Sequence, residues 1–266
     1  MDWSRIKTIF IVSFLLLDIY LIFQFMNTRS EAKYEVIEEA SFEEMLKNND
    51  IIYNEISNDL KKERYISVKP KIFTREDLAP NQILKSSSGD ETAATIIGQL
   101  DKPIKITEKF NPEEFTIAVK SAVQFGEKYR FWKKDETKGT ITFYQLHEGK
   151  MMYNNLNGRL TFFIDDNSEV MLFEQTYIEE VEELSDEQEI LTALGAVEIL
   201  YNKGFLEPKS EITKVELGYS TLIQLAASQV LAPTWRIVVN GEENLFVHGF
   251  EGQVIEFKND DNNITE

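Results

Sequence analysis

The sequence predicts an α+β protein in which one N-terminal transmembrane helix is followed by two related modules, each a helix packed on an antiparallel sheet. Three observations lead to this prediction. An apolar segment lies near the start of the chain, helix-capping sequences at Asn111 and Ser185 open the two principal helices, and strand patterns joined by short polar turns follow each of them. The 266 residues are 42% hydrophobic, which is enough apolar material for a sizeable core.

The transmembrane helix is predicted at residues 8–26, an apolar run long enough to cross the hydrocarbon core of a bilayer. Arg5 and Lys7 precede it, so the positive-inside rule places residues 1–7 in the cytoplasm and the C-terminus outside the cell. A cleaved signal peptide is the alternative. Its apolar region is shorter, about 7–15 residues, and ends in a small-x-small cleavage site, which this flank lacks.

Polar side chains inside this span are predicted to contact other transmembrane helices. Asp18 lies near the middle, where an aspartate costs about 2.5–3.5 kcal/mol to insert, and such residues are candidates for function. At 100° per residue Ser13, Tyr20 and Gln24 share one stripe, and Asp18 lies on another face. The alternative is a simple anchor in which Asp18 is protonated and tolerated.

The charge of the chain restricts its partners. The formal net charge is −18, and residues 1–26 hold two acids and two bases, so the whole excess belongs to residues 27–266. A surface this negative repels nucleic acids and anionic lipid headgroups, which argues against nucleic-acid binding. The chain has no cysteine, so disulfides, thiolate nucleophiles and cysteine-ligated metals are excluded.

The outer region is predicted to begin with a polar stalk at residues 27–40. A first α+β module follows at 41–155, where Ser41 and Glu44 have capping-box spacing and open a short helix. A second α+β module is predicted at 156–258, before a disordered tail at 259–266.

In the first module, Asn111 is predicted to cap a helix that runs from Pro112 to about Tyr129, with proline in the first turn. Its expected buried face consists of Phe115, Ala118, Val119, Ala122 and Val123. Strands are predicted at 140–147 and 150–155, and extended stretches at 64–69, 72–74 and 104–110. Further strands are predicted at 159–165 and 169–178, past the boundary with the second module. Residues 86–90 are expected to form a surface loop.

The second module repeats this order. Ser185 and Gln188 form another capping box, predicted to open a helix at 186–203, and Gly204 is the expected C-terminal stop. Its expected buried face consists of Ile190, Leu194, Val197 and Tyr201. Strands are predicted at 212–222, 235–240, 244–248 and 253–257, with Asn240–Gly241 and Glu251–Gly252 as turns.

The sequence carries no recognisable catalytic, metal or cofactor site, and none is predicted. It has no Gly-x-Ser-x-Gly, no glycine-rich phosphate loop and no His-Glu-x-x-His. His147 and His248 each lie in a strand pattern and are interpreted as structural. The run Glu179–Glu183 is interpreted as a solvated linker, and Asp165–Ser168 as a turn, because it lacks the glycine and distal glutamate of a calcium loop.

Several strings resemble the YycI family (also called WalI) of low-GC Gram-positive bacteria. They begin with Met-Asp-Trp-Ser-Arg-Ile-Lys-Thr-Ile-Phe at 1–10 and Leu-Asp-Ile-Tyr-Leu at 17–21. They continue with Ser-Phe-Glu-Glu-Met-Leu at 41–46, Asn-Gly-Arg-Leu-Thr-Phe-Phe at 157–163, Ala-Pro-Thr-Trp-Arg-Ile at 232–237 and Gly-Gln-Val-Ile at 252–255. The stretch 235–254 also resembles, more weakly, the closing strands of PepSY-type domains.

This resemblance implies a single-pass membrane protein with an extracytoplasmic domain. Such proteins act with a YycH companion and contact the sensor histidine kinase WalK, in part through transmembrane helices. The kinase and its response regulator WalR form a two-component system that controls cell-wall metabolism. The resemblance therefore implies a non-enzymatic regulator in the cell membrane. The alternative is a tethered enzyme or PepSY-like protease-modulating module in the wall space, which a deep pocket of convergent carboxylates would support.

Overall fold

A computed structural model describes residues 3, 7, 10, 11, 13–22, 42–86, 91–107, 109–224 and 228–257. Residues 13–22 and 42–48 are helical. Two further helices are α2 (Pro112–Lys120) and α3 (Ala193–Asn202), and short 3-10 turns occur at Arg75–Asp77, Gly126–Lys128 and Leu156–Gly158. The strands are β1 (Ile52–Tyr53), β2 (Lys62–Glu63), β3 (Ile66–Pro70), β4 (Phe73–Thr74), β5 (Gln82–Leu84), β6 (Thr92–Ala93), β7 (Thr95–Lys105), β8 (Tyr129–Asp135), β9 (Thr140–His147), β10 (Lys150–Tyr153), β11 (Arg159–Ile164), β12 (Glu169–Thr176), β13 (Ile178–Glu183), β14 (Gln188–Glu189), β15 (Glu211–Gln224), β16 (Gln229–Val239), β17 (Glu243–His248) and β18 (Val254–Ile255).

The chain divides into two compact units. The smaller contains residues 1–52 and 207–211, and inside it the Lys209 amide donates to the Asn49 carbonyl over 2.9 Å. The larger contains residues 53–206 and 212–266 and holds nearly all of the strands. Among the described residues, no helix has both the length and the apolar character needed to cross a membrane. Part of the predicted span, together with the stalk at 27–40, Ser41 and the tail at 259–266, lies outside those residues.

The cap of α2 is as predicted. The Asn111 side chain accepts from the amides of Glu113 and Glu114, and Pro112 opens the first turn. The predicted extension to Tyr129 is wrong, because α2 ends at Lys120. Phe125 then takes a left-handed backbone with φ 57°, which a continuing helix cannot contain.

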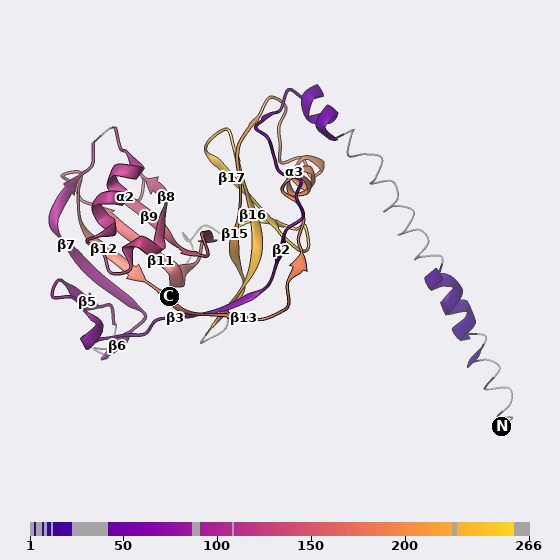
Figure 1. Ribbon diagram of the computed structural model, residues 1–266, viewed down its shortest axis with the longest axis horizontal. Helices are drawn as coiled ribbons and strands as arrows, with labels where there is room; N and C mark the ends of the chain where they lie inside the picture. The colour runs from indigo at the N-terminus through magenta and orange to yellow at the C-terminus, as the bar shows by residue number, and fades with distance from the viewer. Residues whose placement is uncertain are drawn as a thin grey trace. The chain divides into compact units, whose positions relative to one another are not determined.

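The first sheet of the larger unit is antiparallel, in the order β8-β9-β11-β12-β7-β5 (Figure 1). α2 covers one of its faces, where Phe115 packs against Phe143 and Phe162 at ring-centroid distances of 6.1 and 5.2 Å. Phe115, Val119 and Val123 are buried as predicted, whereas Ala118 and Ala122 are exposed, so the buried stripe is narrower than expected. The 11-residue strand β7 also replaces the extended stretch predicted at 104–110.

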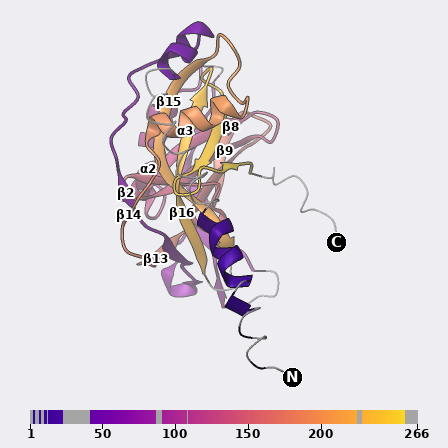
Figure 2. The ribbon, with the colours of Figure 1, turned by 90° about the vertical axis from the view of Figure 1, so that its right-hand side faces the viewer.

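The second sheet has the order β13-β3-β16-β15, with β17 and β18 continuing from β16. α3 packs on β16 (Figure 2). The predicted start of this helix at residue 186 is wrong. Residues 188–189 form β14 instead, and Thr192 caps α3 by accepting from the Gly195 amide over 3.0 Å. The C-terminal stop is confirmed, because α3 ends before Gly204, whose φ is 78°.

The two sheets are joined through β10. This strand pairs antiparallel with β9 on one side and parallel with β15 on the other, where Met152 lies opposite Tyr219. The prediction of an α+β fold is confirmed, but the result is one large mixed sheet rather than purely antiparallel pairing. Gly218 makes the parallel contact possible, because a Cβ atom there would overlap the Met151 carbonyl and the Tyr153 ring.

Candidate functional site

The residues predicted to contact transmembrane partners stay a prediction. Ser13, Asp18 and Tyr20 lie in the helical residues 13–22, and their side chains are exposed. Gln24 lies outside the described residues. Exposed polar groups on a helix are compatible with a partner helix, but nothing in the described part of the chain covers them.

His248 lies at the end of β17 and supports the turn that follows. Its Nδ1 atom accepts hydrogen bonds from the amides of Phe250 and Glu251, over 3.3 and 3.1 Å. The ring is buried, and its Nε2 atom has no hydrogen-bond partner among the described residues. Burial lowers the pKa of His248 from its usual value, and the neighbouring Glu251 opposes this weakly. His147 lies on β9, where its ring packs near Tyr219.

The depressed pKa of His248 predicts that acid weakens the fold. The unfolded histidine takes up a proton near pH 6.5, whereas the folded one resists it, so the unfolded state binds more protons. The contribution of His248 to the free energy of unfolding should therefore decrease as the pH drops below about 6.5, and it should not depend on pH above about 7.5. Urea unfolding of the full chain in detergent, once below pH 6.5 and once above pH 7.5, measures the change in the free energy of unfolding.

The matched variants for this measurement are His248→Gln and His147→Gln. In His248→Gln, the difference in unfolding free energy between the two pH values should be smaller than in the unchanged protein, whatever the substitution does to stability itself. His147→Gln controls for the removal of a histidine elsewhere in the sheet. An unfolding free energy that stays the same or rises on acidification would contradict the assignment.

The described residues contain no group of three or more histidine or carboxylate side chains arranged to hold a metal ion. Asp165–Ser168 forms a turn, as predicted, in which the Asp165 carboxylate accepts from the amides of Asn167 and Glu169. The Asp165 carboxylate thus holds its own turn together.

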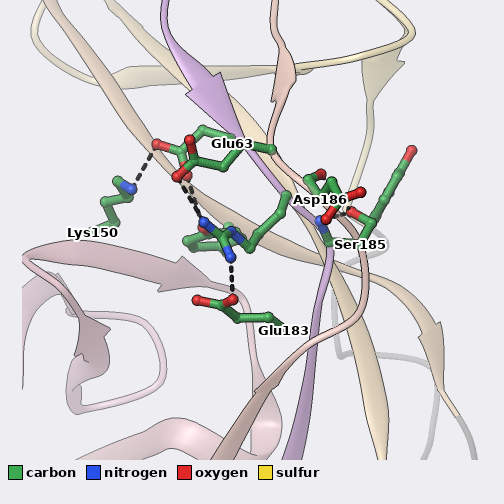
Figure 3. A network of polar contacts seen from close by, with 9 residues as sticks. Glu63, Lys150, Glu183, Ser185 and Asp186 are labelled. Atoms are coloured by element: carbon green, nitrogen blue, oxygen red, sulfur yellow. Dashed lines mark hydrogen bonds and ion pairs between the residues drawn. The ribbon is translucent and has the colours of Figure 1, made fainter.

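A buried carboxylate lies where β2 meets the join between the two sheets. Glu63 is only 8% exposed, and its Oε1 atom is 2.6 Å from the Lys150 ammonium (Figure 3). The Tyr219 hydroxyl donates to Oε2 over 2.9 Å. Burial, followed by the negative charge of Glu63, raises the pKa of Tyr219, so the phenol stays a donor. The cluster therefore ties three distant segments, β2, β10 and β15, to one carboxylate.

The acidic run Glu179–Glu183 is a strand, and its interpretation as a linker is wrong. It forms β13, at the end of the sheet order, and pairs with β3 alone among the described strands. Its carboxylates are held by bases on and beside β3. Lys69 bridges Glu180 and Glu182 at 2.7 and 3.1 Å, Lys71 lies 2.9 Å from Glu179, and Arg64 pairs with Glu183 (Figure 3).

The acids of these clusters are held by ion pairs and by one hydrogen bond. Each acid is matched to a lysine, an arginine or a tyrosine, and Lys69 holds the carboxylates of Glu180 and Glu182 close to each other. β13 is an edge strand whose acidic side chains oppose pairing with other strands.

Two solved structures give partial matches to the chain. One is the crystal structure of an uncharacterized protein from Eubacterium rectale ATCC 33656, which is 13% identical, covers 77% of this chain and 89% of its own, and has a TM-score of 0.42. The other is the Bacillus megaterium YpeB C-terminal domain, which is 12% identical, covers 72% of this chain and 90% of its own, and has a TM-score of 0.34. No curated protein matches the chain.

The family of the chain follows from a broader match. The model of the YycI protein family matches residues 31–250, which includes nearly all of the described strands and both α2 and α3. This match spans well over half of the sequence and agrees with the resemblance of its short strings. The chain therefore belongs to the YycI family.

Proposed function

We propose that this protein is a non-enzymatic, membrane-anchored regulator of a WalK-type sensor histidine kinase, acting together with a YycH-like partner. Membership of the YycI family is the observation that carries the proposal. The matched acids and bases around Glu63 and β13 support it, because they suit assembly rather than chemistry. The output of the kinase is the control of cell-wall metabolism.

In this proposal residues 8–26 span the membrane once, with the N-terminus in the cytoplasm and residues 27–266 outside. The outer part comprises the two related helix-on-sheet modules expected from the sequence. The positions of α2 on the first sheet and α3 on the second support one helix for each sheet, although β11 and β12 belong to the first sheet and β3 to the second. Arg5 and Lys7 on the cytoplasmic side support the orientation.

The transmembrane helix contacts the kinase through Ser13, Asp18, Tyr20 and Gln24. Polar groups inside a bilayer find partners on neighbouring helices because lipid offers none. A regulator of this kind changes kinase activity only if it binds one signalling state more tightly than the other. The contacts are therefore expected to discriminate between helix arrangements of the kinase.

Replacing the anchor tests this function. A variant in which residues 8–26 are exchanged for an unrelated apolar helix keeps the outer region tethered but removes the specific faces. We expect it to lose most of its regulation of a WalR-dependent reporter in cells, and a secreted form lacking residues 1–33 to lose at least as much, because tethering also raises local concentration. Full regulation by the generic anchor would show that the helix is only a tether. No reporter change on deleting the whole gene would refute the regulatory role.

Asp18→Leu is the finer arm of the same experiment. If Asp18 hydrogen-bonds across helices, its loss should weaken association by about 1–2 kcal/mol. Co-purification with the kinase from solubilised membranes, at equal protein level, measures this. Unchanged co-purification would assign Asp18 to the tolerated class.

A further inference from the structure

The face of the first sheet that α2 does not cover carries an open groove. Its volume is about 610 Å³, and strands β8, β9, β11 and β12 supply most of its lining. Charged side chains in the lining are Lys85, Lys133, Asp135, Lys138, Arg159 and Glu174. Trp132, Tyr144, Phe163 and Phe257 contribute aromatic surface.

The strand register explains how these residues come together. Thr161 lies opposite Glu174 on β12 and opposite Thr142 on β9, and Thr142 lies opposite Lys133 on β8. Directly opposed residues of antiparallel strands point to the same face, so each row of the sheet presents one line of side chains. The core residues Phe143 and Phe162 alternate with them and point toward α2.

The groove differs in charge from the rest of the chain. It holds four bases and two acids, a local charge of +2 in a protein whose formal net charge is −18. Lys85 lies 2.7 Å from Glu174, and Lys133 lies 3.4 Å from Asp135, so each acid keeps a base beside it. Both lysine side chains remain more than half exposed and available to a second acid.

Apolar surface is also exposed on this face. Phe163 is 40% exposed and Leu172, directly opposite it on β12, is 42% exposed. Large apolar side chains beside one another on an open sheet face mark a site of protein contact more often than scattered single ones do. The floor of hydroxyl groups from Thr140, Thr142 and Thr161 provides hydrogen-bonding groups between the two kinds of surface.

We infer that this groove binds an acidic segment of a partner protein that also carries apolar side chains. The acids meet Lys85 and Lys133, and the apolar side chains cover Phe163 and Leu172. Charge complementarity carries the assignment, because the groove is a positive region that an acidic segment can reach on an otherwise repelling surface. This deepens the proposed function and rests on it in one respect, since the YycH-like partner is taken as the protein that supplies the segment.

A soluble polyanion fits the groove less well. It has no apolar groups to cover Phe163 and Leu172, and a uniform row of negative charges would meet Asp135 and Glu174 as well as the lysines. A protein segment, by contrast, can have acidic residues beside the lysines and neutral residues beside Asp135 and Glu174.

Photo-cross-linking of the full chain in membranes tests the assignment. A photoreactive amino acid is placed at Phe163 or, as the matched control, at Ile117, which is 74% exposed on α2 and so on the opposite side of the sheet. With the YycH partner co-expressed, adducts are detected by an antibody against that partner. We expect about tenfold more adduct from position 163 than from position 117.

Charge reversal then tests the bases. In the position-163 background, Lys85→Glu with Lys133→Glu should lower the adduct about tenfold, whereas Lys120→Glu on α2 should leave it unchanged. If the partner co-purifies but the two positions give equal adduct, or no adduct, the assignment of the groove is overturned and the proposed function is left intact. Absence of co-purification would contradict both. If polyphosphate binds the purified chain, Phe163→Ser leaves that binding unchanged, and no partner adduct forms, the groove is a polyanion site and the inference is overturned.

Discussion

Gly218→Ala is expected to lower the free energy of unfolding by about 3 kcal/mol. The added Cβ would overlap the carbonyl oxygen of Met151 and the ring of Tyr153, which is fully buried. Because the first of these is backbone, no side-chain rotation relieves the overlap, and β10 must separate from β15. Overpacking of this kind costs about 3 kcal/mol, and a larger side chain such as valine costs more. That is a large fraction of the total stability of an ordinary domain.

Urea unfolding of the full chain in detergent, followed by tryptophan fluorescence, measures this loss. Gly149→Ala is the matched control, since Gly149 lies in the neighbouring turn between β9 and β10 with φ 78° and no atoms near a new Cβ. It reports the backbone cost alone, about 1 kcal/mol. If Gly218→Ala destabilises no more than Gly149→Ala, the close approach of β10 and β15 is wrong.

Glu63→Ala is expected to lower the free energy of unfolding by about 3 kcal/mol. The substitution leaves the Lys150 ammonium without its carboxylate and the Tyr219 hydroxyl without its acceptor, in a site that is largely closed to water. Breaking a buried ion pair costs more than the pair contributes, because the remaining charge stays desolvated. Glu63→Gln keeps an acceptor for Tyr219 and should lose less, about 1–2 kcal/mol.

A double-mutant cycle separates the pair from its surroundings. Glu63→Gln combined with Lys150→Met should cost less than the sum of the two single changes, because each removes the partner of the other. Glu180→Ala is the control, since its ion pair with Lys69 is exposed and such pairs contribute about 0–1 kcal/mol. Additive losses at Glu63 and Lys150 would show that the cluster does not tie the segments together.

Local signals in the sequence were sufficient for the elements that depend on neighbouring residues. Asn111 followed by Pro112 fixed the start of α2, because both the cap and the restricted proline φ act within one turn. The strand pattern at 140–147 has the same bounds as β9, and Asn240–Gly241 forms the tight turn between β16 and β17 with positive φ at both residues. These features are decided by a few adjacent residues.

Features that depend on distant pairing could not be predicted in the same way. The run Glu179–Glu183 has the composition of a solvated segment, yet it pairs with β3, where Lys69, Lys71 and Arg64 form ion pairs with its acids. The helix expected after Ser185 is displaced because residues 188–189 pair with β2 instead. In both places tertiary pairing overrides local preference.

The same limit applies to the candidate sites. Glu63, Lys150 and Tyr219 carry no motif, and only the topology that brings β2 beside the β10–β15 join places them together. The groove is equally hidden, because its residues alternate with core residues on four strands. By contrast, Asp18 can be identified as a candidate from the sequence alone, because it is an ionisable residue within an apolar segment, where a charge is costly.

The pairing of β3 imposes an order on the biogenesis of the protein. β3 is synthesised early, yet its partners β13 and β16 are synthesised much later. Val68, for example, pairs with Gln229. The first sheet is made of strands between residues 82 and 176 and has all its partners much sooner. As the chain emerges from the ribosome, and again as it crosses the membrane in the proposed topology, one sheet can close while β3 stays an open template. Contacts between segments so far apart form slowly, and unpaired strands invite wrong pairing in the interval. β3 therefore stays unpaired until residues 178–183 and 229–231 have been synthesised.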